Sequence, residues 1–175
     1  MNLRATLSCA AMTLLPVTAS AEAARYALEP LSEFQDGCQD GCACPITVRS
    51  LEGTFVLTPL GHQDDFELFD VTDVAWIIKN DSPGTFVSGS GTFRIRAGAD
   101  PAQRLELDLS IGSSDPIRFD SGLVPVAATW PNIEVAIAMN GFFCYDNVFS
   151  VNARPGISIS VEPTSWGRAK GRYRR

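Results

Sequence analysis

The chain has 175 residues, of which 45% are hydrophobic and 19% are charged, and its formal net charge is −6. This length allows one domain or two very small ones, and this composition excludes wholesale disorder. The negative charge argues against nucleic acid as the main partner. The 14 glycines and 11 prolines are scattered, which favours many turns over long helices.

Residues 1–23 have the pattern of a secretory signal peptide. Arg4 is the only charge before Glu22, an apolar stretch runs from residue 5 to residue 17, and residues 21–23 (Ala-Glu-Ala) fit a cleavage site. The apolar stretch is too short for a comfortable transmembrane span, although an uncleaved anchor is the alternative. The sequence therefore predicts an exported protein, periplasmic or extracellular, with no transmembrane span in the mature chain.

Four cysteines follow the signal peptide, which itself contains Cys9: Cys38, Cys42, Cys44 and Cys144. An even number in an exported chain predicts two disulfides. A bond between Cys42 and Cys44 would close a very tight ring. Two schemes remain: Cys38–Cys42 with Cys44–Cys144, which we favour, or Cys38–Cys44 with Cys42–Cys144. A site of four thiolates around zinc or an iron–sulfur cluster is the alternative, but the spacing does not match paired C-x2-C knuckles.

The segment 24–45 is predicted to be irregular, rich in cysteine and packed on the following domain. From residue 46 to residue 163 the chain reads as one all-β domain. Short runs of alternating or apolar residues recur at roughly ten-residue spacing, and no window predicts an amphipathic helix. These runs cover residues 46–49, 53–58, 66–79, 92–96, 105–109, 117–120, 134–139, 142–151 and 157–161. We expect an antiparallel β-sandwich or barrel of about eight to ten short strands, stabilised by disulfides.

Three local features refine this expectation. The run 66–79 is either two strands or one strand bent near residues 70–73. The runs 92–96 and 105–109 predict a hairpin in which Arg94 and Arg96 lie across from Glu106 and Asp108. Asn140-Gly141 predicts a tight turn between two further strands.

Catalytic chemistry has little support in the sequence. The chain contains no G-x-S-x-G motif, and its single histidine, His62, lies in a polar loop. Paired carboxylates could act as in glycosidases, but the many acidic residues make no one pair specific. We identify no catalytic residue, and the sequence favours binding over catalysis.

Two acidic loops are candidates for calcium, because hard oxygen ligands on a loop suit this ion. One loop contains Asp36 and Asp40, and the other contains Asp64 and Asp65. Neither loop matches the EF-hand pattern, and the alternative is that these carboxylates shape turns. No other cofactor is predicted.

Ligand contacts are predicted for three aromatic residues. Trp130 lies in a proline-flanked loop, whereas Trp166 and Tyr173 belong to a basic tail, residues 164–175, that we expect to be disordered. Residues 25–167 carry a net charge of −11, and the final eight residues carry +5. The acidic balance therefore disfavours polyanions for the folded body, but the tail could contact one.

These observations lead to three hypotheses for function. The main one is an exported, non-catalytic β-domain that binds a carbohydrate, an envelope component or a protein. The second is a β-barrel that carries an apolar small molecule or lipid. The third is a hydrolase that uses paired carboxylates.

Overall fold

The computed structural model describes residues 22–38, 44–79 and 83–156. These residues form an all-β fold of ten antiparallel strands, as the sequence predicts, with no helix among them. Accordingly, the described part of the chain has no helix that is long and apolar enough to cross a membrane. The expected signal peptide, apart from Glu22 and Ala23, the expected strand 157–161 and the basic tail lie outside the described residues.

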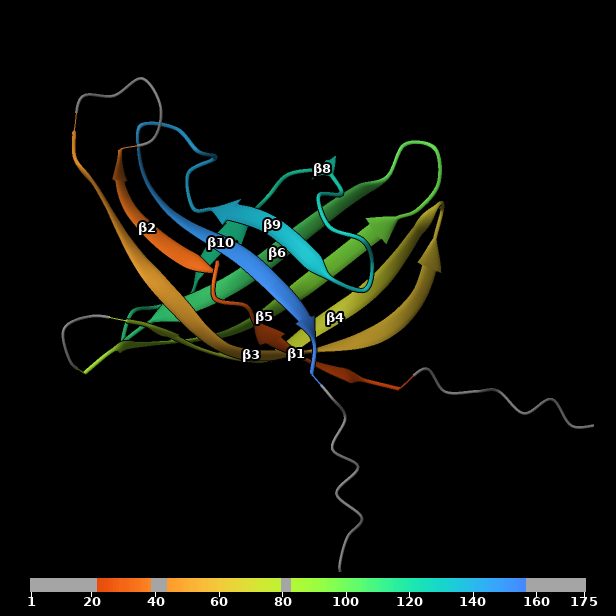
Figure 1. The fold of residues 1–175 in the computed structure, drawn as a ribbon, viewed down its shortest axis with the longest axis horizontal. Helices are drawn as coiled ribbons and strands as arrows, with labels where there is room; N and C mark the ends of the chain where they lie inside the picture. Colours follow the sequence, from red (N-terminus) through yellow and green to blue (C-terminus); the bar gives the residue numbers. More distant parts are fainter. Residues whose placement is uncertain (1–21, 39–43, 80–82, 157–175) are drawn as a thin grey trace, which may run out of the picture.

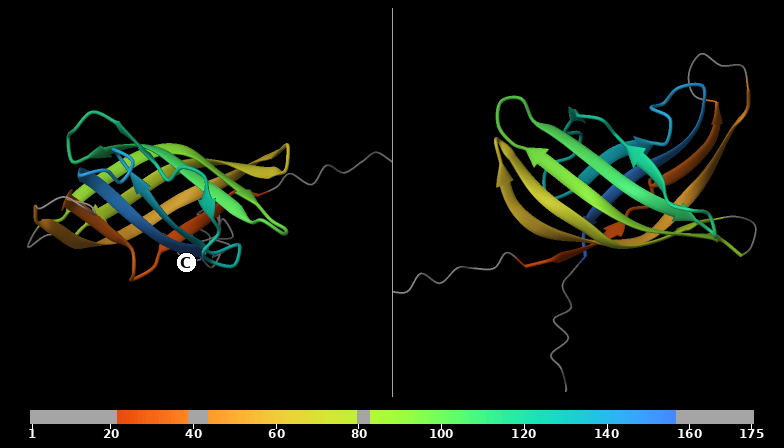
Figure 2. Two further views of the ribbon diagram at one scale, coloured as in Figure 1. Left: turned by 90° about the horizontal axis from the view of Figure 1, so that it is seen from above. Right: turned by 180° about the vertical axis from the view of Figure 1, so that it is seen from behind.

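The ten strands follow the chain in order and differ widely in length (Figure 1). They are β1 (Ala24–Leu28), β2 (Glu33–Cys38), β3 (Ile46–Gln63), β4 (Phe66–Ile78), β5 (Thr85–Arg96), β6 (Ala102–Ile111), β7 (Ile117–Asp120), β8 (Val124–Pro125), β9 (Ile133–Ala138) and β10 (Tyr145–Pro155). The four long strands β3 to β6 lie side by side and form one continuous wall (Figure 2).

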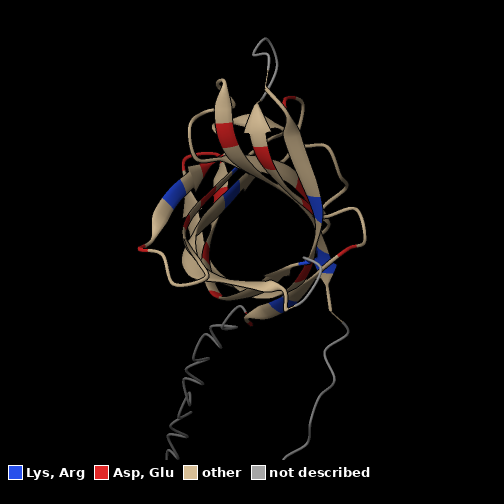
Figure 3. Cartoon of the chain, turned by 90° about the vertical axis from the view of Figure 1, so that its left-hand side faces the viewer, with Lys and Arg blue, Asp and Glu red and all other residues tan. Residues whose placement is uncertain are grey.

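The sheet closes on itself and forms a barrel. Strands β3, β4, β5, β6 and β7 pair in chain order, β7 pairs with β9, and β9 pairs with β10. Strand β10 then pairs with both β1 and β2, and each of these also pairs with β3. Because β1 and β2 share one position and β7 and β8 both lie along β6, the ten strands occupy eight positions around the ring. Figure 3 looks along the barrel and shows this ring.

The interior of the barrel is packed with apolar side chains. Alternate residues of each strand point inward, and they form one hydrophobic cluster whose members are at most 7% exposed. Phe149 of β10 lies at its centre, with ring centroids 4.8 Å from Phe34, 5.6 Å from Trp76 and 5.0 Å from Phe119. These rings come from β2, β4 and β7, so aromatic contacts join different sides of the barrel wall.

The segment 24–45 is not irregular as the sequence predicts, because it contains β1 and β2, which complete the barrel wall. Each strand is too short to give a strong pattern alone, and together they fill the position between β10 and β3. The buried Ser32 sits at the break between them. Its hydroxyl donates to the carbonyl oxygen of Asn152 at 2.8 Å and accepts from the N–H of Asn152 at 3.1 Å. The Ser32 side chain therefore supplies the hydrogen bonds to β10 at the point where the backbone between β1 and β2 does not.

Strands β3 and β4 are longer than the sequence patterns indicate. The runs 46–49 and 53–58 belong to one strand of 18 residues that continues past Pro59. Irregular pairings near Phe55 and Leu60 absorb the interruption. Strand β4 is one strand with a register shift between Val71 and Val74, which confirms the bent-strand alternative.

The predicted hairpin of residues 92–96 and 105–109 is present as β5 and β6, but its charge pairing is wrong. Arg94 lies opposite Arg104, and Thr92 lies opposite Glu106. The acidic residues of β6 instead meet arginines on their other side, where Arg118 of β7 contacts Asp108 at 2.9 Å and Glu106 at 3.3 Å. The length of the connecting loop sets this register, and the exposed charges pair with whichever neighbour it brings near.

The connection between β9 and β10 is wider than the tight turn that Asn140-Gly141 predicts. Asp146 is completely buried, and its carboxylate accepts the backbone N–H groups of Asn140 at 2.9 Å and Phe142 at 2.8 Å. Phe142 and Cys144 have φ values of 62° and 46°, in the left-handed region. A buried carboxylate therefore organises this loop in place of a two-residue turn.

The structure has a disulfide between Cys38 and Cys44, whose Cα atoms are 5.3 Å apart. This bond contradicts our favoured pairing of Cys38 with Cys42 and agrees with the second scheme. It joins the end of β2 to the residues that lead into β3, so it clamps two strands that are already paired. Cys144 is also in a disulfide, and Cys42 lies outside the described residues.

Candidate functional site

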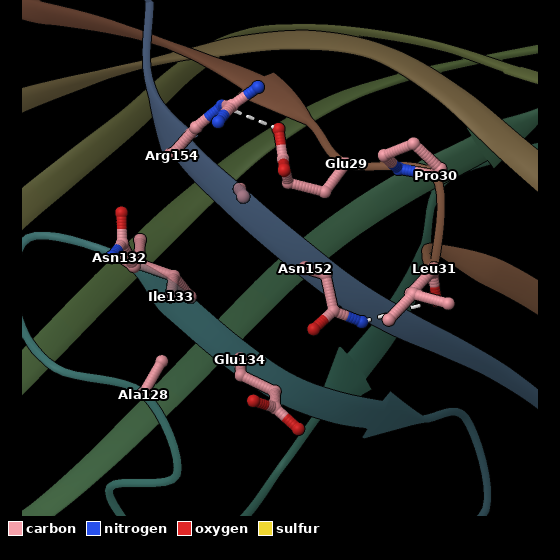
Figure 4. Close-up of a pocket in the computed structure, with 10 residues that line it drawn as sticks. Glu29, Pro30, Leu31, Ala128, Asn132, Ile133, Glu134, Asn152 and Arg154 are labelled. Carbon is pink, nitrogen blue, oxygen red and sulfur yellow. Dashed lines mark hydrogen bonds and ion pairs between the residues drawn. The ribbon is translucent and has the colours of Figure 1, made fainter.

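An open groove runs along the outside of the β9–β10 pair. It consists of two adjoining depressions, of about 410 Å³ and 480 Å³, which share Leu31, Glu134 and Asn152. We call this feature the outer groove. Figure 4 shows its first half, where side chains of β9 and β10 lie between the β1–β2 turn and the loop before β9.

The floor of the outer groove is made of small or polar side chains. Because residues alternate between the two faces of the wall, Ala136 of β9 and Ser150 and Asn152 of β10 point outward. Ala136 lies opposite Ser150, and Ser150 lies opposite Glu33 of β2. This row of small residues leaves the depression that a ligand would occupy.

The two walls come from segments far apart in the sequence. One wall is the β1–β2 turn, where the Asn152 side chain donates to the carbonyl oxygen of Leu31 at 3.2 Å. Together with the bonds of Ser32, this contact fixes the turn while the Leu31 side chain stays 75% exposed. The opposite wall is formed by residues 124–128, and Phe142 lines the far end. The groove therefore combines polar groups with exposed apolar side chains.

Carboxylates dominate the charge of the outer groove. Glu29 is neutralised by Arg154 at 2.7 Å. In contrast, the carboxylates of Glu33 and Glu134 form no hydrogen bond or ion pair within the described residues. Apart from Arg154, which pairs with Glu29, all described Lys and Arg residues except Arg25 and Arg94 pair with carboxylates elsewhere on the barrel. The groove thus keeps two acceptor groups available to a ligand.

Beneath the groove, Gln103 bridges the two sides of the barrel seam between β8 and β9. Its side chain is 1% exposed, and its amide donates to the carbonyl oxygens of Glu134 at 2.7 Å and Pro125 at 3.4 Å. These bonds replace strand pairing, because β9 pairs with β7 at a single position, Asp120 opposite Ala138. The seam is consequently the least paired part of the wall.

The predicted ligand residue Trp130 lies outside the outer groove. Its ring packs 5.2 Å from Phe69 and 5.9 Å from Phe93, between centroids, and closes one end of the core. It remains 36% exposed and lines a third depression of about 330 Å³. The other two predicted ligand residues, Trp166 and Tyr173, lie outside the described residues.

The calcium candidates do not converge in the structure. Asp36 accepts from Arg49 at 3.5 Å and from the Tyr145 hydroxyl at 2.8 Å, and the latter bond raises the pKa of Tyr145. Asp64 and Asp65 lie in the β3–β4 turn, where Asp65 meets Arg96 at 3.1 Å. Asp40 lies outside the described residues, among which no group of three or more metal-ligating side chains occurs.

The contacts of the single histidine do not form a catalytic arrangement with a nucleophile. His62 is on the exposed end of β3, with Nε2 3.7 Å from the carboxylate of Glu67. The sequence did not single out the groove residues, because Glu33, Glu134 and Asn152 come from three separate strands. The available signal was a single acidic residue, Glu134, within the otherwise apolar run 133–138.

No protein-family model, curated protein or solved structure shows a significant match to this chain.

Proposed function

We propose that the protein is an exported, non-catalytic binding protein and that the outer groove is its ligand site. The observation that carries this proposal is the continuous groove with two carboxylates, Glu33 and Glu134, that form no hydrogen bond or ion pair within the described residues. A polar ligand such as a carbohydrate, an envelope component or a protein segment would supply the missing partners. The Cys38–Cys44 disulfide and the apolar pattern of residues 5–17 support export.

The packed interior favours surface binding over carriage of a lipid. The inward side chains of the core cluster are almost inaccessible to water, so they leave no room along them for an apolar ligand. A hydrolase would have to use Glu33 and Glu134, which line the same half of the groove. Both carboxylates are on the open outer surface of the wall, whereas general acids are commonly raised in pKa by burial.

Retention on glycans, cell-envelope fractions and peptide arrays tests the proposal. Ala136→Trp would fill the groove floor and should abolish retention. Ala75→Trp is the matched control, because Ala75 is an outward alanine of β4 on another part of the wall, and it should bind like the wild type. Equal retention by both variants would place the ligand elsewhere. Release of cleaved products that stops in Glu134→Gln would replace binding with hydrolysis.

A further inference from the structure

The loop between β8 and β9 separates the outer groove from the third depression, which lies beside Trp130. Ala128 lines the first half of the groove (Figure 4), and Ala127 lines the second half. Both residues also line the third depression, whose volume is about 330 Å³. Because their side chains are small, the loop places little bulk between the two hollows. A ligand that extends beyond the groove can therefore cross this loop and enter the depression.

The Trp130 ring is an aromatic platform in this depression. One face of the ring stacks on Phe93, with 18° between the ring planes, and the ring also contacts Phe69. Because Trp130 is still 36% exposed, the face that points away from the core is open toward the depression that the residue lines. An aromatic face that packing holds in place is suited to stack on another flat, apolar surface.

The groups around this platform favour a polar ligand without charge. The indole N–H of Trp130 and the exposed hydroxyl of Thr129 form no hydrogen bond within the described residues. Arg96 is the only charged residue in the lining of the depression. Its guanidinium is already occupied by Asp65 at 3.1 Å and Asp100 at 2.9 Å. The depression therefore offers hydrogen bonds to hydroxyl groups and no unpaired charge to an ionic ligand.

The outer groove selects in the same direction. Its unpaired carboxylates, Glu33 and Glu134, accept hydrogen bonds from hydroxyl groups and repel anions. The exposed side-chain amide of Asn132 can both donate and accept. The one cation of the groove, Arg154, is held by Glu29 at 2.7 Å. An acidic ligand would thus find carboxylates and no available cation.

An extended peptide is less suited to the groove, because it has no backbone edge to pair with. The Gln103 amide joins the carbonyl oxygens of Glu134 and Pro125, and Ala138 pairs with Asp120. Only Ala136 lies between these two closures, so β9 leaves no room for an added strand. Recognition in the groove therefore depends on side chains, which suits a ligand rich in hydroxyl groups.

We propose that the protein binds a linear, uncharged glycan that lies along the outer groove, crosses the loop at Ala127 and Ala128, and stacks one sugar ring on Trp130. A pyranose ring matches this site, because its face carries C–H groups and its edge carries hydroxyls. The depression is large enough for one such ring. The proposal rests on the outer groove being the ligand site. It adds the ligand class and a second subsite at Trp130.

Titration with three neutral chains, cellohexaose, chitohexaose and maltohexaose, tests the proposal. At least one should bind the wild type, and its affinity should fall about tenfold or more in Trp130→Leu. Phe86→Leu removes an exposed ring of β5 that lines neither hollow, and it should bind like the wild type. The acidic chain hexagalacturonate should bind more weakly than the best neutral chain. Absence of binding by all three neutral chains would overturn the proposal, and so would equal affinity of Trp130→Leu and the wild type.

A measurement that keeps the Trp130 ring is also needed, because Trp130→Leu removes part of the cover of the core. The chain has three tryptophans. In Trp166→Phe, fluorescence therefore comes from Trp130 and from Trp76, which is 1% exposed. Acrylamide should quench the emission of Trp130, and a bound neutral chain should protect it. A chain that binds without reducing the quenching would place the sugar away from Trp130 and overturn the proposed subsite.

These results also distinguish the two proposals. If a peptide from the binding panel is retained by the wild type and lost in Ala136→Trp, while no neutral chain binds, the groove function stands and the glycan proposal is wrong. If a neutral chain protects Trp130 but binds Ala136→Trp as tightly as the wild type, the Trp130 subsite stands and the proposed function of the groove is wrong.

Discussion

Ser32 connects separate strands through its side chain, and this makes it sensitive to substitution. Ser32→Ala would leave the N–H of Asn152 without its acceptor, because that acceptor is the Ser32 hydroxyl at 3.1 Å. A buried unsatisfied donor costs about 1–3 kcal/mol. We expect the free energy of unfolding, measured by urea denaturation, to fall by this amount.

A surface serine is the control for this experiment. Ser113 lies exposed in the turn after β6, and Ser113→Ala should change stability by less than about 0.5 kcal/mol. Ser32 also holds the wall that carries Leu31, so Ser32→Ala should weaken binding in the outer groove as well. Equal stabilities of the two variants would show that the β1–β2 break does not depend on this hydroxyl.

Asp120 contributes stability that depends on pH. The hydrogen bond from Arg104 lowers the pKa of Asp120, with further help from the Gly122 N–H and the charges of Arg104 and Arg118. A carboxyl whose pKa is lower in the folded state stabilises the fold above its unfolded pKa of about 3.9, and this stabilisation is lost as the pH falls through the folded value. Asp120→Asn should therefore be less stable than the wild type at pH 7, with a gap that closes below about pH 4.

Urea titrations at a series of pH values measure this gap. Asp115→Asn is the control, because no ion pair involves Asp115 in the described residues, and its stability should follow the wild type throughout. A gap between Asp120→Asn and the wild type that stayed constant down to the lowest pH would mean that packing, and not ionisation, explains the loss.

At the scale of elements, alternation predicts strands well where each strand has one apolar face. Residues 92–96 and 105–109 are recognisable as a hairpin from this pattern alone, whereas the pattern of residues 66–79 leaves two strands and one bent strand as alternatives, of which the structure has the second. The strands within segment 24–45 are not predicted from the sequence. Strands β1 and β2 together fill one position in the barrel wall, and each is too short to show a clear alternation of apolar and polar residues. Strand β10, which pairs with both of them, lies far away in sequence.

The outer groove also cannot be predicted from local sequence, because its residues are far apart along the chain. Its walls and floor come from the β1–β2 turn, residues 124–136 and residues 150–154, and only barrel closure brings them together. Trp130 is an aromatic residue in a loop, so the sequence predicts a ligand contact for it, but one face of its ring packs against Phe69 and Phe93. A loop that crosses the end of a barrel can supply a core residue, and local sequence does not distinguish this case from an exposed binding residue.

Each disulfide joins two segments of the chain, and peptide mapping can test which cysteines are paired. We expect non-reducing peptide mapping to find Cys38 linked to Cys44, as in the structure, and Cys144 linked to Cys42, the partner that remains in the second scheme. A short loop and a loop of about 100 residues contribute about 2 and about 4–5 kcal/mol, respectively, in a chain-entropy treatment. Replacing Cys42 and Cys144 with alanine should therefore destabilise the barrel more than replacing Cys38 and Cys44. A peptide that joins Cys38 to Cys42 would contradict this scheme.

At the scale of the whole molecule, stability depends on contacts through the interior as well as on the ladders of the wall. Backbone pairing is nearly continuous from β3 to β7 but is reduced to one residue pair and the Gln103 bridge at the seam. The aromatic cluster around Phe149 spans this weakness, because Phe119 of β7 and Phe149 of β10 lie on opposite sides of it. Core packing therefore holds the barrel closed where the backbone does not.

Phe149→Ala tests this role, because it removes a ring that is 0% exposed and contacts three other rings. Truncation of a buried phenylalanine costs about 3–5 kcal/mol. Phe143→Ala makes the same chemical change at a residue that is 72% exposed, and it should cost less than about 0.5 kcal/mol. The cavity in Phe149→Ala is lined by apolar groups, so a small aromatic such as benzene should raise its melting temperature and leave that of the wild type unchanged. A rise of equal size in the wild type would mean that the interior already admits an apolar ligand, and it would favour the carrier hypothesis over binding in the outer groove.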